Sequence, residues 1–134
     1  MDNITIARNK KQLNITLIHQ FLTNSYLAKG RTIEQVTESI DHSICYGVYK
    51  NEQQIGFARV ISDKVVFAYI MDVFIIDHER ANGYAVQLLD EVLQDRDLDE
   101  VKQWYLKTKD AHQFYAKSGF KDLEHPEWFM GRLR

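Results

Sequence analysis

The spacing of apolar residues predicts one strand and two helices in the first third of the chain. Ile4 and Ile6 alternate with polar neighbours, as in a short strand. Thr32 and Gln35 have the spacing of a capping box, which predicts a helix start. The apolar residues at helical spacing are Leu13, Leu17, Ile18, Phe21 and Leu22 in the first helix, and Ile33, Val36 and Ile40 in the second.

Three apolar runs in the middle of the chain predict an antiparallel meander. Residues 44–49 and 55–61 are joined by a turn at residues 51–53, and a second turn leads into residues 65–76. Periodicity does not separate strand from buried helix in the third run, but its Val, Ile, Phe and Tyr content favours a strand. Because strands usually span about 5–6 residues, we expect a bulge or bend within it.

After Gly83 the spacing of apolar residues becomes helical, and Ala85, Leu88 and Val92 lie on one face of an expected amphipathic helix. Residues 101–107 alternate as a strand, Asp110 is expected to cap a short helix that Gly119 closes, and residues 128–133 are apolar enough for a final strand. The order β-α-α-β-β-β-α-β-α-β predicts an α/β (α+β) fold. We expect one domain over residues 1–134, with a mixed, mostly antiparallel central sheet flanked by about four helices.

Composition narrows the classes of function. The net charge of -2 and the absence of any Lys/Arg block argue against a nucleic-acid binder. Cys45 is the only cysteine, so we expect no internal disulfide, and a small buried side chain rather than a metal ligand. The five histidines show no metal-ligand spacing. The longest apolar run is too short to span a bilayer and no signal core precedes it, so we expect a cytoplasmic protein without membrane contact.

Residues 77–85 are a candidate anion site. They join the long strand to the amphipathic helix, where unpaired backbone N–H groups and the helix dipole favour a phosphate or pyrophosphate. Gly83 allows close approach of the backbone, and Arg80 can add a charged hydrogen bond. The alternative is a simple Asn82-Gly83 turn beside a solvated arginine, and the residues alone do not decide between the two.

Two motifs resemble those of the GNAT superfamily of N-acetyltransferases. Residues 80–85 (RANGYA) match its R/Q-x-x-G-x-G/A signature, and residues 111–120 (AHQFYAKSGF) resemble its A-x-x-x-Y-x-x-x-G-F segment. Residues 56–60, 68–75 and 108–112 are similar to a bacterial subgroup of that superfamily. The resemblance covers nearly the whole chain and implies the GNAT fold, with acetyl-CoA as co-substrate and no metal.

The resemblance also implies roles for individual residues. Backbone N–H groups of Asn82 to Ala85 would hold the pyrophosphate, the edge of the long strand would pair with the pantetheine arm, and Tyr115 would protonate the departing thiolate. Thr108 stands where many relatives carry an asparagine that contacts the cofactor, and Ala81 where glycine is commoner. The implied cofactor-binding residues are Val73, Phe74, Ile75, Arg80, Ala81, Asn82, Gly83, Tyr84, Ala85 and Thr108.

A general base is required, because only a neutral amine attacks a thioester. Asp72 is the one charge within residues 65–76, so it is either that base or a buried acid paired with an arginine. Arg59 and Asp63 could line the acceptor pocket, although solvated or mutually paired roles fit them better. His112 is more often a surface residue in such a position than a ligand or base. The candidate contacts of the acceptor are Tyr26, Arg31 and Trp128, each with a packed or surface role as the alternative.

Three functions remain open at this stage. The first is transfer of acetyl to a primary amine of a small molecule or peptide. The second is a GNAT-fold module that binds acyl-CoA without turnover, and the third is a protein-interaction domain without a small ligand. A strand edge near the C-terminus could also support a homodimer.

Overall fold

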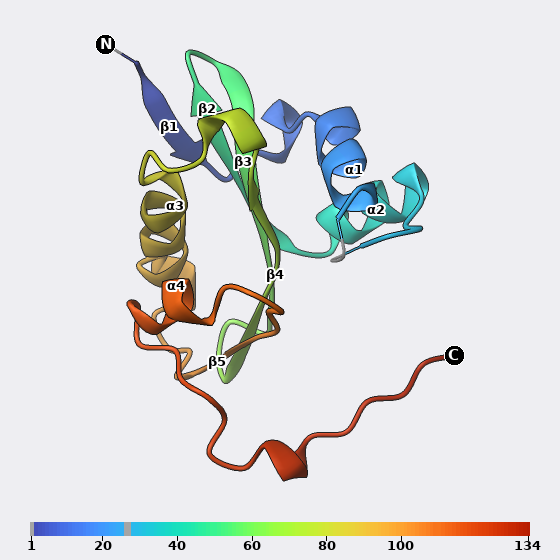
Figure 1. The fold of residues 1–134 in the computed structure, drawn as a ribbon, viewed down its shortest axis with the longest axis vertical. Coiled ribbons are helices and arrows are strands. Elements are labelled where there is room, and N and C mark those ends of the chain that lie inside the picture. The colour runs from blue at the N-terminus through green and yellow to red at the C-terminus, as the bar shows by residue number, and fades with distance from the viewer. Residues whose placement is uncertain (1, 26–27) are drawn as a thin grey trace.

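The computed structural model describes residues 2–25 and 28–134, which form a twisted sheet covered by helices on both faces (Figure 1). The strand order is β1-β2-β3-β4-β5, antiparallel except for the parallel pair β4 and β5. The strands are β1 (Ile4–Ala7), β2 (Ile44–Lys50), β3 (Gln53–Ser62), β4 (Phe67–Ile75) and β5 (Gln103–Leu106). The predicted mixed, mostly antiparallel sheet is confirmed.

Helices α1 (Ile15–Thr23) and α2 (Ile33–Asp41) lie on one face of the sheet, and α3 (Tyr84–Leu93) and α4 (His112–Ala116) on the other (Figure 1). The capping box that opens α2 is confirmed: Thr32 Oγ1 accepts the Gln35 N–H at 3.1 Å, and Gln35 Oε1 accepts the Thr32 N–H at 2.8 Å. Ile33, expected to point inward, is exposed at the first position of α2. Among the described residues, the short 3₁₀ turns are η1 (Lys10–Gln12), η2 (Asp77–Glu79), η3 (Arg96–Leu98) and η4 (Pro126–Trp128).

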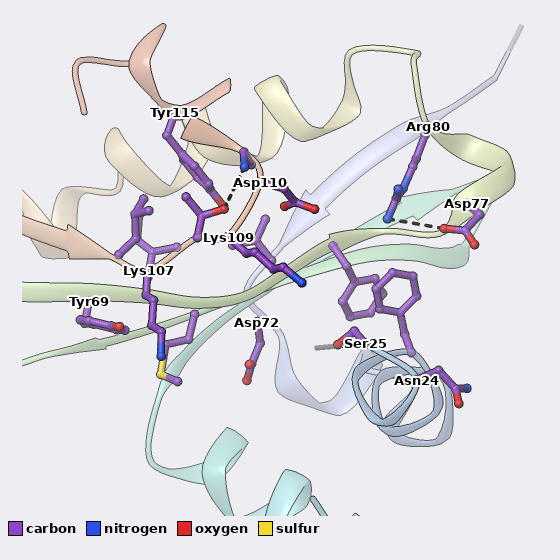
Figure 2. Close-up of a pocket in the computed structure, with 18 of the residues that line it drawn as sticks. Asn24, Ser25, Tyr69, Asp72, Asp77, Arg80, Lys107, Lys109, Asp110 and Tyr115 are labelled. Atoms are coloured by element: carbon purple, nitrogen blue, oxygen red, sulfur yellow. Dashed lines mark hydrogen bonds and ion pairs between the residues drawn. The ribbon is translucent and has the colours of Figure 1, made fainter. Parts of the chain in front are cut away.

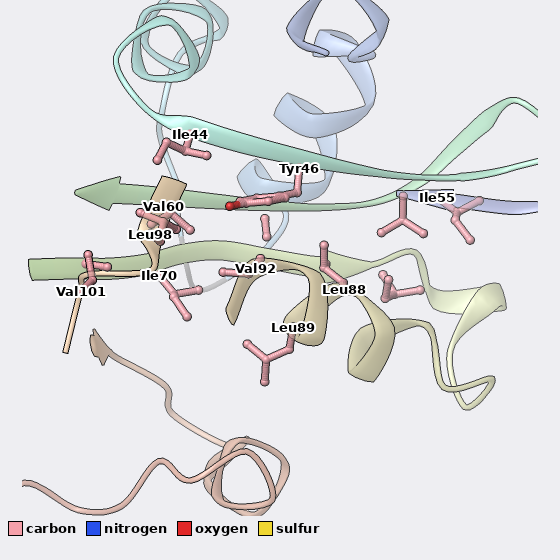
Figure 3. Close-up of a cluster of buried hydrophobic side chains, with 14 residues drawn as sticks. Ile44, Tyr46, Ile55, Val60, Ile70, Leu88, Leu89, Val92, Leu98 and Val101 are labelled. Carbon is pink, nitrogen blue, oxygen red and sulfur yellow. The ribbon is translucent and has the colours of Figure 1, made fainter. Parts of the chain in front are cut away.

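Each face of the sheet carries its own apolar core. Leu88, Leu89 and Val92 of α3 pack on side chains of β2, β3 and β4, as their helical spacing predicted (Figure 3). On the other face, α1 and α2 cover Phe57, Phe74 and Cys45. Cys45 is therefore the buried apolar side chain that the sequence indicated.

The bulge expected in the long strand is present in β4. Phe57 pairs with Phe74, but Arg59 pairs with Met71, so β4 places one extra residue opposite β3. Asp72 lies in that interval with φ 56°, in the left-handed region. Ala68 and Ile70 before the bulge face α3, whereas Phe74 after it faces α1 and α2. The extra residue therefore reverses which side chains face which core.

Strand β5 accompanies β4 for only part of its length. Their pairing ends at Ile70 and Leu106, while β4 continues along β3 to Ile75. From Met71 onward, the edge of β4 that faces away from β3 has no strand partner in the described chain. This separation of two neighbouring strands creates space at the centre of the sheet.

Two expectations for the C-terminal part are wrong. Ala111, not Asp110, is the N-cap of α4, and Thr108 Oγ1 accepts the Ala111 N–H at 3.1 Å. The final strand at residues 128–133 is absent: η4 and an extended segment run away from the sheet (Figure 1). Apolar content favours a strand only where the segment runs along an edge that satisfies its backbone hydrogen bonds, and this segment turns away from the sheet instead (Figure 1). Gly119, with φ 94°, follows α4 in the left-handed region as expected.

Candidate active site

A cavity of about 1200 Å³ opens where β4 and β5 separate. Its walls come from α1, β4, the loop after β4, the end of β5 and the start of α4 (Figure 2). The polar and charged side chains that line it are Gln20, Asn24, Ser25, Tyr69, Asp72, Asp77, Arg80, Lys107, Thr108, Lys109, Asp110 and Tyr115. The strand separation thus brings six of the predicted catalytic and cofactor-binding residues to one site: Asp72, Val73, Phe74, Arg80, Thr108 and Tyr115.

The exposed edge of β4 supplies backbone groups to this cavity. The Ile76 N–H donates to the Ile55 carbonyl at 2.8 Å, toward β3. Because backbone polar groups of a strand alternate in direction, those of Ile75 and Val73 point to the opposite, open side. Arg80 Nε accordingly reaches the Ile75 carbonyl at 3.3 Å. An extended ligand could therefore pair with β4 as an added strand does.

The side chains of Phe74 and Ile75 pack in the apolar cores on the two faces of the sheet. The Phe74 ring stacks on Phe21 of α1, with centroids 4.1 Å apart. The Ile75 side chain is buried in the core under α3, so only its backbone is available on the open edge. Val73 is half-buried and lines the cavity. The backbone of this segment, rather than its side chains, is the feature suited to binding.

The loop between β4 and α3 ends in an uncapped helix start. Gly83 is the N-cap of α3 with φ 79°, and no described side chain accepts hydrogen bonds from the first-turn N–H groups of Tyr84 and Ala85. A Cβ at position 83 would meet nothing within 4 Å, so space lies open in front of this turn. Asn82 holds the loop by donating from Nδ2 to the Glu79 and Arg80 carbonyls. Unpaired donors and the helix dipole make this turn suited to an anion.

Arg80 lies beside that turn and lines the cavity. Its guanidinium is 3.5 Å from Asp77 Oδ1, an exposed pair that Figure 2 marks with a dashed line. Exposed ion pairs of this kind contribute about 0–1 kcal/mol, so an incoming phosphate can displace the carboxylate. Arg80 is thus placed to add a charged contact next to the start of α3.

Tyr115 projects from α4 with its hydroxyl directed toward the strands (Figure 2). Its ring is fixed by edge contacts with Phe114 and Phe120, at centroid distances of 5.0 and 5.9 Å. Thr108 also lines the cavity, with its Oγ1 engaged by the Ala111 N–H. Tyr115 is the phenol of α4 that the motif singled out, and it lies at the cavity wall.

Asp72 lies on the other side of the strands from Tyr115, toward α1 and α2 (Figure 2). Its Oδ2 accepts hydrogen bonds from Arg59 Nε at 2.9 Å and from Arg31 at 2.8 Å. Asp72 is only 4% exposed and Arg59 only 6%, and Arg59 also donates to Ser43 Oγ at 3.0 Å. These contacts are those of the paired structural acid, which was the alternative to a base.

The remaining candidates within the described residues lie away from the cavity. Asp63 accepts N–H bonds from residues 65–67, which lower its pKa and close the turn before β4. His112 is exposed on α4, and Trp128 is exposed on the C-terminal segment. Tyr26 lies outside the described residues.

Sequence reasoning missed Lys107 and Lys109, which flank Thr108 and line the cavity. Their position directly after a strand, next to a residue already singled out, was the available signal.

Within residues 2–25 and 28–134, no group of three His, Cys, Asp or Glu side chains could hold a metal ion. In the same ranges, every helix is too short or too polar to cross a membrane.

Comparison with known proteins assigns the family. The acetyltransferase (GNAT) domain family matches residues 41–122, more than half of the chain. A GNAT-family protein from Xanthomonas campestris pv. campestris is 37% identical over 98% of this chain and 94% of its own, with a TM-score of 0.95. This chain therefore belongs to the GNAT acetyltransferase family, and the fold that its motifs implied is confirmed.

Two more distant proteins extend the comparison. FG08082 of Gibberella zeae, provisionally named an acetyltransferase, is 27% identical over 116 residues, and the match spans 70% of this chain and 64% of that protein. A GNAT-family acetyltransferase from Elizabethkingia anophelis, solved with acetyl-CoA bound, shares the fold at 20% identity with a TM-score of 0.70, over 90% of this chain and 78% of its own.

Proposed function

We propose that this protein transfers an acetyl group from acetyl-CoA to a primary amine of a small molecule or peptide. The observation that carries the proposal is the open edge of β4, which runs from the uncapped start of α3 to the cavity beneath Tyr115. An anion site, a strand edge and a phenol in that order suit the pyrophosphate, the pantetheine arm and the thioester sulfur. The acetyl-CoA in the Elizabethkingia anophelis relative supports the same ligand.

Cofactor binding would rest mainly on backbone groups. The N–H groups of Asn82 to Ala85 would donate hydrogen bonds to the pyrophosphate, with Arg80 turning from Asp77 to the same charge. The Val73 and Ile75 backbones would pair with the amides of the pantetheine arm. Because the backbone contacts do not depend on side-chain identity, Ala81 would be tolerated where glycine is commoner.

The transfer step would be direct. The neutral amine attacks the thioester carbonyl, a C–N bond forms, and the carbonyl oxygen becomes an oxyanion that the Val73 N–H can stabilise. As the C–S bond breaks, the sulfur leaves as a thiolate and takes a proton from the Tyr115 hydroxyl. The extra proton of the attacking nitrogen passes to a base.

Asp72 is the candidate base, but its contacts support a different role. Both arginines bind the same carboxylate oxygen, and the residue lies at the bulge that shapes the edge of β4. We therefore assign Asp72 to holding the bulge and Val73 in place, and the amine proton to solvent in the open cavity.

Release of the coenzyme A thiol, measured with a panel of amines and peptides, tests this function. We expect at least one amine to give release above hydrolysis, with acetylated product of matching amount. Binding of acetyl-CoA without turnover on any amine would favour the non-catalytic module, although such a module has no use for a phenol at position 115. Absence of acetyl-CoA binding would favour the protein-interaction domain.

A further inference from the structure

The last 14 residues, 121–134, form an arm that leaves large apolar side chains uncovered. Trp128 is 72% exposed, Phe129 54%, Met130 96% and Leu133 97%. Figure 1 shows the arm running away from the sheet and helices to the C-terminus. Single exposed apolar residues are ordinary, but a contiguous group of this size marks an interaction surface.

The root of the arm has a defined shape. Within η4, the Trp128 N–H donates to the His125 carbonyl at 3.0 Å, and the His125 and Trp128 rings stack with centroids 3.8 Å apart. Phe129 then packs its edge on Tyr105 of β5, at 5.7 Å between centroids. The arm is thus directed outward from β5 by local contacts.

A receiving surface lies next to this root. β5 is the last strand of the sheet, so one of its edges has no strand partner within the described chain. Around it, Val65 and Val66 just before β4 and Phe67 at its first position are exposed. Phe67 contacts Tyr105 at 5.8 Å, so the exposed apolar surface is continuous from β4 across β5 to the arm.

We propose that the arm packs on β5 and the start of β4 of a second copy of this chain, in a symmetric dimer with exchanged arms. The arm and the receiving surface belong to the same chain. In a two-fold symmetric dimer, the arm of each copy therefore covers the receiving surface of the other copy. A single foreign partner on the arm would leave the β5 edge and Val65 to Phe67 exposed.

The area available matches a stable dimer. Aromatic side chains bury about 150–250 Å² each, so one arm with two aromatics, a methionine and a leucine offers roughly 500 Å². Each arm covers a comparable area on the other copy, which brings two arms to roughly 2,000 Å² in total. That value lies at the upper end of standard specific interfaces.

The test is the mass of the whole chain in solution, measured by light scattering during size exclusion over a range of concentrations. We expect a dimer, and Met130→Asp and Leu133→Asp should each convert it to a monomer with unchanged circular dichroism. The matched control is Ile33→Asp, which alters an exposed apolar residue on α2 outside the proposed contact and should leave the dimer intact. A monomeric wild-type chain, or a dimer that survives both arm variants, would overturn the proposal.

A second measurement needs no variant. Trypsin cleaves after Arg132, which is exposed in the single chain. An exchanged arm predicts that this cleavage slows several-fold as the protein concentration rises through the dimer range. Cleavage at the same rate per molecule at every concentration would contradict the exchange. Neither measurement involves acetyl-CoA, so their outcome is independent of the proposed transfer reaction.

Discussion

Replacement of Asp72 by Asn separates a structural carboxylate from a catalytic one. Asn retains the shape of the side chain and tolerates φ 56°, but it removes the charge that Arg59 and Arg31 share. The variant therefore leaves the Arg59 guanidinium, which is 6% exposed, without its anion.

The expected loss of stability follows from that burial. Removing one partner of a buried ion pair costs about 3–5 kcal/mol, because the other charge stays in a poorly solvated site. The Asn carbonyl can still accept one hydrogen bond, so the lower end, about 3 kcal/mol, is expected. At roughly 3 °C per kcal/mol for a chain of this length, Tm should fall by about 10 °C.

Urea unfolding followed by circular dichroism measures this loss. The exposed Asp90→Asn on α3 is the matched control and should change stability by less than about 0.5 kcal/mol. Combining Asp72→Asn with Arg59→Met should recover part of the loss, since the second change removes the unpaired cation. Unchanged stability in Asp72→Asn together with a large fall in kcat would refute the structural role and restore Asp72 as the base.

Three further outcomes are expected. Tyr115→Phe should lower kcat by about 10–10⁴-fold with little change in acetyl-CoA affinity, and an unchanged rate would remove the phenol from the reaction. Ala81→Gly should raise the free energy of unfolding by about 0.5–1 kcal/mol in urea titrations, because Ala81 has φ 65°; a loss of stability would show that this conformation carries no strain. Burial raises the pKa of the Cys45 thiol to about 11, so it should stay protonated and react with a disulfide reagent only after unfolding; rapid reaction of the folded protein at about pH 8 would contradict its burial.

Much of the fold could be predicted because periodic patterns report local burial. The α3 pattern and the α2 capping box depend on residues three or four apart, and both were confirmed. The bulge in β4 followed from the length of an apolar run. The C-terminal strand was wrong because pairing needs a segment that runs along a free edge, and composition does not reveal the path of the chain.

The site was only partly predictable, because local motifs can be read from the sequence whereas pairing between distant residues cannot. Arg80 and Tyr115 each belong to a short local motif and line the cavity, and Gly83 to Ala85 of the first motif form the start of α3. The pairing of Asp72 with Arg59, 13 residues apart, depends on a register that the bulge shifts by one residue. The end of β4–β5 pairing at Ile70, which opens the cavity, has no local signature at all.

The most direct test of the central claim is the thermal stability of the wild-type chain and of Gly83→Val with and without acetyl-CoA. A branched side chain at position 83 is strained at φ 79° and fills the space before the helix start, so it should remove the anion site. At about 100 times its Kd, acetyl-CoA should stabilise the wild type by about 2.7 kcal/mol, roughly 8 °C, and Gly83→Val by much less. No shift in the wild type, or an equal shift in both proteins, would contradict binding of acetyl-CoA along β4 and the start of α3.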